Sequence, residues 1–287
     1  APATGTTMIA RIVCEGRTPE DKRAEERILL DAFGPRWPRG LRAKFVITPG
    51  GFVHGDWPSS WSGRFGWASR TADIEPLVRE AERQLASVVT GRVYRAARGK
   101  ADVLTVGIDL FRDGDDGAPH AELVAVIDLA KQRVVRWTGK SYPTSRQERT
   151  LVQVVDLDSH LLEIAGERTL VLGCHDLNMF SPRGHANQSP DGVRRARCNE
   201  MKHKVARFKP TVVLQHPHST DTPNIWRMPW LSLAQDVPTA RVWASGIAYY
   251  NNKNHGGPRA KLGKVLALTK SAGNDVRDIV VDARSYE

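Results

Sequence analysis

The sequence predicts one α/β domain in which helices pack outside strands, and three observations support this. The chain opens with a strand-like run, a helix-like run and a second strand-like run, which together form a β-α-β unit. Strand-like and helix-like runs alternate again toward the C-terminus. No internal repeat, low-complexity tract or Ser/Gly-rich linker divides the 287 residues. We therefore expect a single domain that spans residues 1–287.

Each expected element rests on its own periodicity and end signals. Helices need apolar residues on one face and a cap, which predicts helices at residues 18–34, 71–91, 194–209 and 225–240. Runs rich in β-branched residues and bounded by turn residues predict strands at residues 6–14, 43–51, 102–114, 150–158, 168–176, 211–217 and 241–251. Residues 121–140 are expected to form strands joined by a Lys-Gln turn. We expect the last segment, residues 263–287, to form a hairpin that closes the sheet.

Composition limits the class of protein. With 40% hydrophobic residues the chain can bury a substantial core. It has no run of about 18 apolar residues that could span a membrane, and its first residues lack the layout of a signal peptide. The three cysteines, Cys14, Cys174 and Cys198, are odd in number and have no Cys-x-x-Cys spacing. They predict neither a disulfide framework nor a zinc knuckle, and we expect a cytoplasmic protein.

The net charge of +10 is compatible with anionic substrates, nucleic acid or an acidic partner. The eight tryptophans could stack on bases, but most lie in runs that also fit the loops over a pocket. Lys and Arg are spread along the chain, and their densest cluster, residues 194–209, fits the solvated face of one helix. A nucleic-acid-binding module is therefore an alternative that we do not favour.

The run TLVLGCHDLNMFSPRG, residues 169–184, carries the main candidate for chemistry. Cys174 lies where a buried strand ends and a turn begins, which is where open α/β sheets place ligands. A cysteine there is a nucleophile if a neighbour lowers its pKa, and otherwise it is a buried thiol. Lys140 ends the strand-like run VVRWTGK, and a lysine in that position can stabilise an oxyanion or a thiolate.

The order of these motifs resembles the nitrilase, or carbon–nitrogen hydrolase, superfamily. The resemblance rests on VGIDLFRDG, AELVAVIDLAKQRVVRWTGKSYP and then TLVLGCHDLNMFSPR, and it extends over most of the chain. It implies a four-layer αββα sandwich with mixed sheets. It also implies a thiol-dependent hydrolase of a small non-peptide amide or nitrile, with no metal and no cofactor. Cys174 would be the nucleophile, and Lys140 with the backbone N–H of His175 would stabilise the oxyanion.

The resemblance also requires a glutamate that moves protons, directly after the proline of AKFVITPGG, and this chain has Gly50 after Pro49. Loss of a general base or acid removes about 10²–10⁴-fold in rate. Glu148, eight residues after Lys140, is one candidate replacement, and His54 or Asp56 of the loop GGFVHGD is another. The remaining interpretation is a protein that binds a ligand, protein or nucleic acid without hydrolysis.

Histidines and acids near the strand ends leave a metal-dependent hydrolase as a further alternative. Its ligands would come from His175, Asp176, His216 and His218, with His185 as an additional candidate. Pro217 indicates a loop rather than a strand there. Otherwise His175, Asp176, His54 and His216 are expected to line the substrate or oxyanion pocket. The resemblance further implies a homo-oligomer, in particular a homodimer, with residues 194–208 as its candidate surface.

Overall fold

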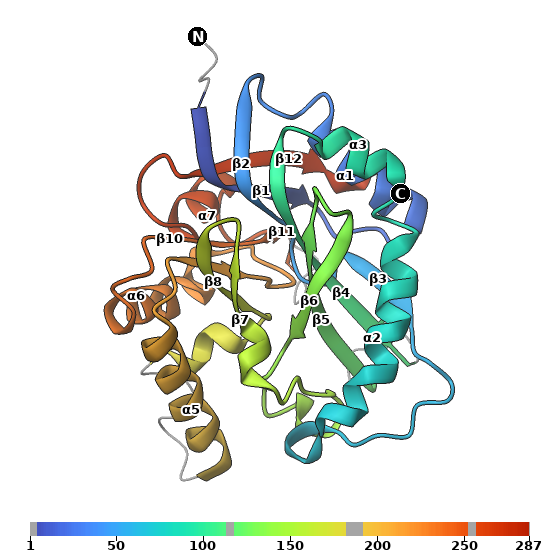
Figure 1. Ribbon diagram of the computed structural model, residues 1–287, viewed down its shortest axis with the longest axis vertical. Coiled ribbons are helices and arrows are strands. Elements are labelled where there is room, and N and C mark those ends of the chain that lie inside the picture. Colours follow the sequence, from blue (N-terminus) through green and yellow to red (C-terminus); the bar gives the residue numbers. More distant parts are fainter. Residues whose placement is uncertain (1–4, 113–117, 182–191, 252–256, 287) are drawn as a thin grey trace.

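Two β-sheets pack face to face, and helices cover the outer face of each (Figure 1). This arrangement is seen in a computed structural model that describes residues 5–112, 118–181, 192–251 and 257–286. Both sheets contain parallel and antiparallel pairs. The expected four-layer αββα sandwich with mixed sheets is therefore confirmed.

The larger sheet has the strand order β11-β1-β2-β4-β5-β6, with β12 also paired to β1 and β3 to β4. Its first strands run parallel, and the β4-β5-β6 part is an antiparallel meander. Its strands are β1 (Gly5–Glu15), β2 (Leu41–Ile47), β3 (Val53–Asp56), β4 (Ala101–Phe111), β5 (His120–Asp128), β6 (Arg133–Gly139), β11 (Ile247–Tyr249) and β12 (Val276–Asp282).

The smaller sheet has the order β10-β9-β8-β7. Its strands are β7 (Leu161–Ile164), β8 (Glu167–Leu172), β9 (Val212–Gln215) and β10 (Val242–Ser245). Apolar side chains fill the space between the two sheets, including Phe45 and Val126 of the larger sheet and Val171 and Leu214 of the smaller one. This continuous apolar layer fixes the sheets relative to each other.

Helices on each outer face bury an apolar stripe. For example, Asp21 caps the first helix by accepting a hydrogen bond from the Ala24 N–H, and Ile28 and Phe33 of that helix are buried against the sheet. The larger sheet is covered by α1 (Lys22–Phe33), α2 (Thr71–Ala86) and α3 (Gly91–Ala97), and the smaller by α5 (Gly192–Phe208) and α6 (Arg227–Asp236). Short 3₁₀ turns are η1 (Gly66–Ala68), η2 (Gln147–Arg149), η3 (Leu157–His160), η4 (Asp176–Met179), η5 (Pro223–Ile225) and η6 (Ala283–Tyr286).

The expected C-terminal hairpin is wrong. Residues 262–268 form helix α7 (Leu262–Leu268), and the following β12 pairs in parallel with β1. Val265 of this helix packs in one apolar cluster with Val13 and Ile247, which lie far from it in the sequence. The single strand expected at 241–251 divides at Gly246 into β10 and β11, which belong to different sheets. A Cβ at Gly246 would lie 2.3 Å from the Thr48 carbonyl oxygen, so a glycine is needed at this crossing.

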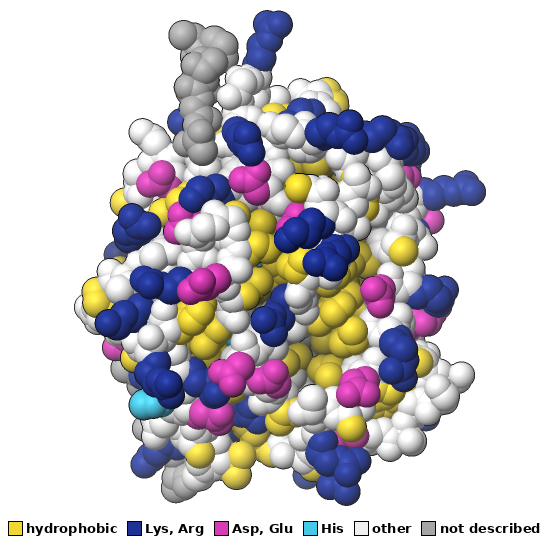
Figure 2. All heavy atoms as spheres, in the orientation of Figure 1, with side chains coloured by type: hydrophobic (Ala, Val, Ile, Leu, Met, Phe, Trp, Pro, Cys, Tyr) yellow, Lys and Arg dark blue, Asp and Glu magenta, His cyan; other side chains and the backbone are white. Residues whose placement is uncertain are grey.

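On the face shown in Figure 2, Lys and Arg are spread over the surface and interspersed with Asp and Glu. In α5, Cys198, Met201 and Val205 are buried, so the expected solvated helix has an apolar stripe on its inner side. None of the helices in the described part of the chain has the length and apolar character that a membrane crossing requires.

Candidate active site

The nucleophile turn, residues 173–176, follows the central strand β8 of the smaller sheet. Strand β8 ends at Leu172, and Cys174 lies in the turn before η4, with only 6% of its surface exposed. A Cβ at Gly173 would lie 2.8 Å from both the N and the Cα of Lys140. Only glycine therefore allows the turn to pack directly against the backbone that carries the lysine.

Asp176 joins the nucleophile turn to the segment after β6. Its Oδ1 accepts hydrogen bonds from the N–H groups of Ser141 (2.9 Å) and Tyr142 (2.8 Å), and its Oδ2 accepts one from Gly173 (2.9 Å). The carboxylate is fully buried. Both oxygens are thus committed to backbone donors, and Asp176 fixes Cys174 and Lys140 in one arrangement.

Lys140 is paired with a carboxylate that the sequence did not single out. Its Nζ lies 2.7 Å from Oε1 of Glu122 on β5, and only 1% of the lysine is exposed. Burial lowers the pKa of Lys140, but the charges of Glu122 and Cys174 outweigh burial and raise it. Burial likewise favours the neutral form of Glu122, yet Lys140 and His218 hold its pKa well below the usual range. The two groups form a buried ion pair.

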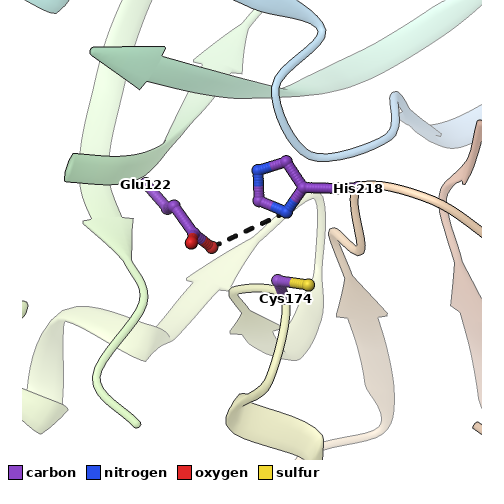
Figure 3. A group of neighbouring side chains, drawn as sticks. All are labelled: Glu122, Cys174 and His218. Carbon is purple, nitrogen blue, oxygen red and sulfur yellow. Dashed lines mark ion pairs between the residues drawn. The ribbon is translucent and has the colours of Figure 1, made fainter. Parts of the chain in front are cut away.

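His218, in the loop after β9, brings two carboxylates together. Its Nε2 lies 2.7 Å from Oδ2 of Asp109, and its Nδ1 lies 3.7 Å from Oε2 of Glu122. Donor atoms of Glu122, Cys174 and His218 all lie within 4.8 Å of one another, and the three side chains converge in Figure 3. Asp109 and Glu122 are direct partners in the β4-β5 ladder, so both carboxylates point to the same face. Like charges in that position repel, and the cations of Lys140 and His218 compensate them.

These charges set the ionisation of the nucleophile. Burial raises the pKa of the Cys174 thiol, but the charges and hydrogen bonds of His175 and His218 outweigh burial and lower it from 9.0 to about 5. Burial also lowers the pKa of His218, but Asp109, Glu122 and Cys174 outweigh it and raise the pKa well above 6.5. At neutral pH the site therefore holds a Cys174 thiolate beside a protonated His218.

The structure explains why Gly50 cannot be a glutamate. A Cβ at Gly50 would lie 2.5 Å from the carbonyl oxygen of His216, and the Gly50 N–H donates to the Pro217 carbonyl at 2.9 Å. Gly51 has φ +57°, and a Cβ there would lie 2.7 Å from Oδ2 of Asp109. The two glycines thus leave room for the loop that carries His218.

Glu148 and His54, which were also predicted for the site, have charged partners other than Cys174. Glu148 forms an ion pair with Arg194 rather than with Lys140, and its side chain is 32% exposed. His54 contacts Glu25 of α1, with Nδ1 to Oε1 at 3.4 Å.

Two predicted histidines lie nearer to the nucleophile. The ring of His175 packs edge-on against Trp226, and His175 is one of the groups that lower the pKa of Cys174. His216 is buried, and burial lowers its pKa to about 3, which keeps its ring neutral.

The residues expected to hold a metal do not form one ligand set. Both oxygens of Asp176 accept backbone N–H groups, and His185 lies outside the described residues. Within the described ranges, the group close enough to hold an ion is Glu122, Cys174 and His218. The Lys140 ammonium, 2.7 Å from Glu122, would repel a cation there. The arrangement fits proton and acyl transfer better than metal binding.

Sequence reasoning missed Asp109 and Glu122 because both lie inside strand-like apolar runs, VGIDLF and HAELVAV. A carboxylate within a buried strand is itself a signal, since Asp and Glu are almost never fully buried unless paired. The pattern could have marked both positions, but it could not have identified their partners.

Comparisons with known proteins support the fold. No protein-family model and no curated protein matches the sequence. The fold is similar to that of a Cys-to-Ser mutant of an amidase of the nitrilase superfamily from Nesterenkonia sp. AN1, with a TM-score of 0.51 at 14% identity over 85% of this chain and 78% of that one. It is equally similar to a mutant of that amidase with the acetamide moiety of fluoroacetamide on its active-site cysteine (TM-score 0.50, 15% identity, 86% and 78% coverage). This chain therefore has the fold of the nitrilase-superfamily amidases.

Proposed function

We propose that this protein is a thiol-dependent hydrolase that cleaves the C–N bond of a small primary amide, with Cys174 as its nucleophile. The observation that carries the proposal is the convergence of Cys174, His218 and Glu122, whose donor atoms lie within 4.8 Å of one another, with Glu122 paired to Lys140. The lowered pKa of Cys174 supports it. A nucleophile of lowered pKa, a proton-transfer group and a buried cation are the parts that acyl transfer requires. The amidase fold of the structural neighbours is consistent with this chemistry.

In the first half of the reaction, Sγ of Cys174 attacks the amide carbon and the carbonyl π electrons move onto oxygen. Lys140 Nζ and the N–H of His175 stabilise that oxyanion. Asp109 holds the Nε2 proton of His218, so the proton on Nδ1 is the one that moves to the amide nitrogen. The C–N bond then breaks, ammonia leaves and Cys174 carries a thioester.

In the second half, water attacks the thioester carbon and neutral His218 accepts the proton of that water. The C–S bond breaks, its electron pair returns to Sγ of Cys174, and a carboxylic acid is released. The thiolate and the protonated His218 are restored. His218 thus performs the proton transfers for which the missing glutamate after Pro49 was expected, and binding without hydrolysis is not needed to account for Gly50.

The site also favours an amide over a nitrile or an ester. Oε2 of Glu122 is buried, has no hydrogen-bond partner among the described residues and lies 3.7 Å from Nδ1 of His218, in a carboxylate that reaches within 4.8 Å of Cys174. A buried acceptor without a partner costs about 1–3 kcal/mol, and a substrate N–H would satisfy it. A primary amide brings an oxygen for Lys140 and an N–H for Glu122, whereas a nitrile or an ester brings no N–H.

The test compares two alkylating probes, iodoacetamide, whose amide nitrogen carries two hydrogens, and its N,N-dimethyl derivative, in which methyl groups replace them. Rates at Cys174 are measured by intact mass and divided by the rates with free cysteine. We expect the wild-type protein to prefer iodoacetamide by about tenfold, the value of one hydrogen bond to a charged group of about 1.5 kcal/mol. The ratio cancels any change in thiolate content, because both probes react with the same sulfur.

Two variants locate the source of the preference. In Glu122→Gln the side-chain oxygen must face Lys140, so the NH₂ group occupies the position of Oε2. An NH₂ group cannot accept the N–H of the probe, and the preference for iodoacetamide should disappear. Glu148→Gln is the matched control, and it should leave the ratio unchanged. If Cys174 reacts with neither probe at neutral pH, the nucleophile assignment fails. If it reacts equally with both, only the recognition of the amide fails.

The remaining expectations about assembly and location stay predictions. A homo-oligomer that uses residues 194–208, and a cytoplasmic location, follow from the resemblance and from cysteine usage. Size-exclusion chromatography with light scattering tests the oligomer.

A further inference from the structure

A chain of buried hydrogen bonds leads from α6 to the nucleophile turn. The indole Nε1 of Trp230 lies 2.8 Å from Oγ of Ser245, and that Oγ lies 2.7 Å from Oε1 of Gln215. Nε2 of Gln215 then donates to the carbonyl oxygen of Cys174 at 2.8 Å. Trp230, Ser245 and Gln215 are each 0% exposed, so water does not compete for these bonds.

The chemistry of the donors fixes the direction of this chain. An indole N–H can only donate, so Oγ of Ser245 must accept from Trp230. The serine hydroxyl proton is then free to be donated onward to Gln215. The carbonyl oxygen of Cys174 can only accept, which assigns the NH₂ end of the Gln215 amide to Cys174 and its carbonyl end to Ser245. The amide therefore cannot flip without breaking two buried hydrogen bonds.

The chain fixes one peptide plane in the site. The peptide between Cys174 and His175 is planar and trans, so its N–H points opposite to its carbonyl. Since the carbonyl points to Gln215, the N–H of His175 points away from β9. No acceptor for this N–H occurs among the described residues. Asp176 holds the N–H of Gly173 and the turn after Lys140, but not this peptide.

We propose that Gln215 is a positioning residue, which holds the Cys174–His175 peptide so that the His175 N–H donates to the oxyanion. This inference rests on the proposed function. Trp230 and Ser245 extend the same role, because they complete the buried hydrogen bonds at the carbonyl end of the Gln215 amide.

The experiment compares two reactions of the same sulfur. Alkylation by iodoacetamide displaces iodide and forms no oxyanion. Acylation by p-nitrophenyl acetate forms the Sγ–C bond, passes through an oxyanion and releases p-nitrophenolate with the electron pair of the broken C–O bond. A defect in the oxyanion donor should slow the second reaction and spare the first. Both rates are measured at Cys174, and Cys174→Ser provides the blank.

Methionine is similar in size to glutamine but has no side-chain N–H. We expect Gln215→Met to slow acylation by about tenfold to hundredfold, which is less than the loss of about 10²–10³-fold in rate when an oxyanion donor is removed completely. Its alkylation rate should stay within about twofold of wild type. Ser245→Ala provides a second test if Gln215→Met does not fold. Trp243→Phe is the matched control. The ring of Trp243 stacks on Trp230 with centroids 4.4 Å apart but takes no part in the hydrogen bonds that lead to Cys174, so this variant should change neither rate.

Equal loss of both reactions in Gln215→Met would overturn the inference, since it would indicate a general structural effect. Unchanged acylation in both variants would also overturn it. Acylation that is absent from the wild-type protein, while Cys174 is alkylated readily, would show that the site stabilises no oxyanion. Absence of alkylation as well would instead refute the proposed function itself.

Discussion

Replacement of His218 by asparagine tests the charge that keeps Cys174 ionised. Asparagine retains an N–H group for Asp109 but carries no positive charge, so the variant removes the cation and keeps a donor. Of the two histidines that lower the pKa of Cys174 against the effect of burial, only His175 would then remain. The pKa of the thiol should rise.

The size of the effect follows from the two limits. The pKa of Cys174 lies at about 5 in the protein, against 9.0 for an ordinary thiol. Loss of one opposite charge shifts a pKa by about 1–3 units, so we expect a midpoint near roughly pH 7. At pH 6 the thiolate fraction would then fall from roughly 90% to roughly 10%, a loss of about ninefold. Above about pH 9 the difference in thiolate fraction should vanish, because Cys174 is ionised in both proteins.

The assay is the alkylation rate of Cys174 by iodoacetamide as a function of pH, followed by intact mass. The midpoint is the readout rather than the rate, because the intrinsic nucleophilicity of a thiolate falls with its pKa. His216→Asn is the matched control, since the ring of His216 is already neutral. An unchanged midpoint in His218→Asn, or an equal rise in the control, would refute the assignment of His218 as the charged partner of Cys174.

Three further predictions follow from the same geometry. The rate of amide hydrolysis should fall below about pH 5, because the Cys174 thiolate becomes protonated. It should also fall well above pH 6.5, because His218 loses the proton that the leaving nitrogen needs. A rate profile with no fall on the acid side would contradict this. Gly50→Glu should lower the free energy of unfolding in urea by about 1–3 kcal/mol through overpacking and should not raise activity, whereas Gly263→Ala, where a Cβ meets nothing, should not destabilise. Asp176→Asn should cost about 1–3 kcal/mol for each backbone N–H left without an acceptor, and a near-wild-type urea midpoint would exclude this latching role.

Local sequence pattern determined much of the fold, and it identified Cys174 and Lys140 but not the role proposed for His218. Strand and helix periodicity predicted the β-α-β opening and the basic helix, whereas the four-layer arrangement with two mixed sheets followed from the family resemblance. Strand-end position marked Cys174 and Lys140, because a strand followed by a turn brings its last residues to the edge of the sheet. These signals need only neighbours within a few residues, so they can be derived from the sequence. The C-terminal hairpin failed because the contact of Val265 with Val13 and Ile247 is not local.

Tertiary structure alone decided which carboxylates and which histidine lie near Cys174. Asp109 and Glu122 face each other through the register of an antiparallel ladder. His218 reaches them because its loop packs on Gly50, and that close approach excludes the glutamate expected there. Glu148 is near Lys140 in sequence, yet it pairs with Arg194. Proximity in sequence says little about which charges meet, because strand register and loop packing are set by contacts between distant segments.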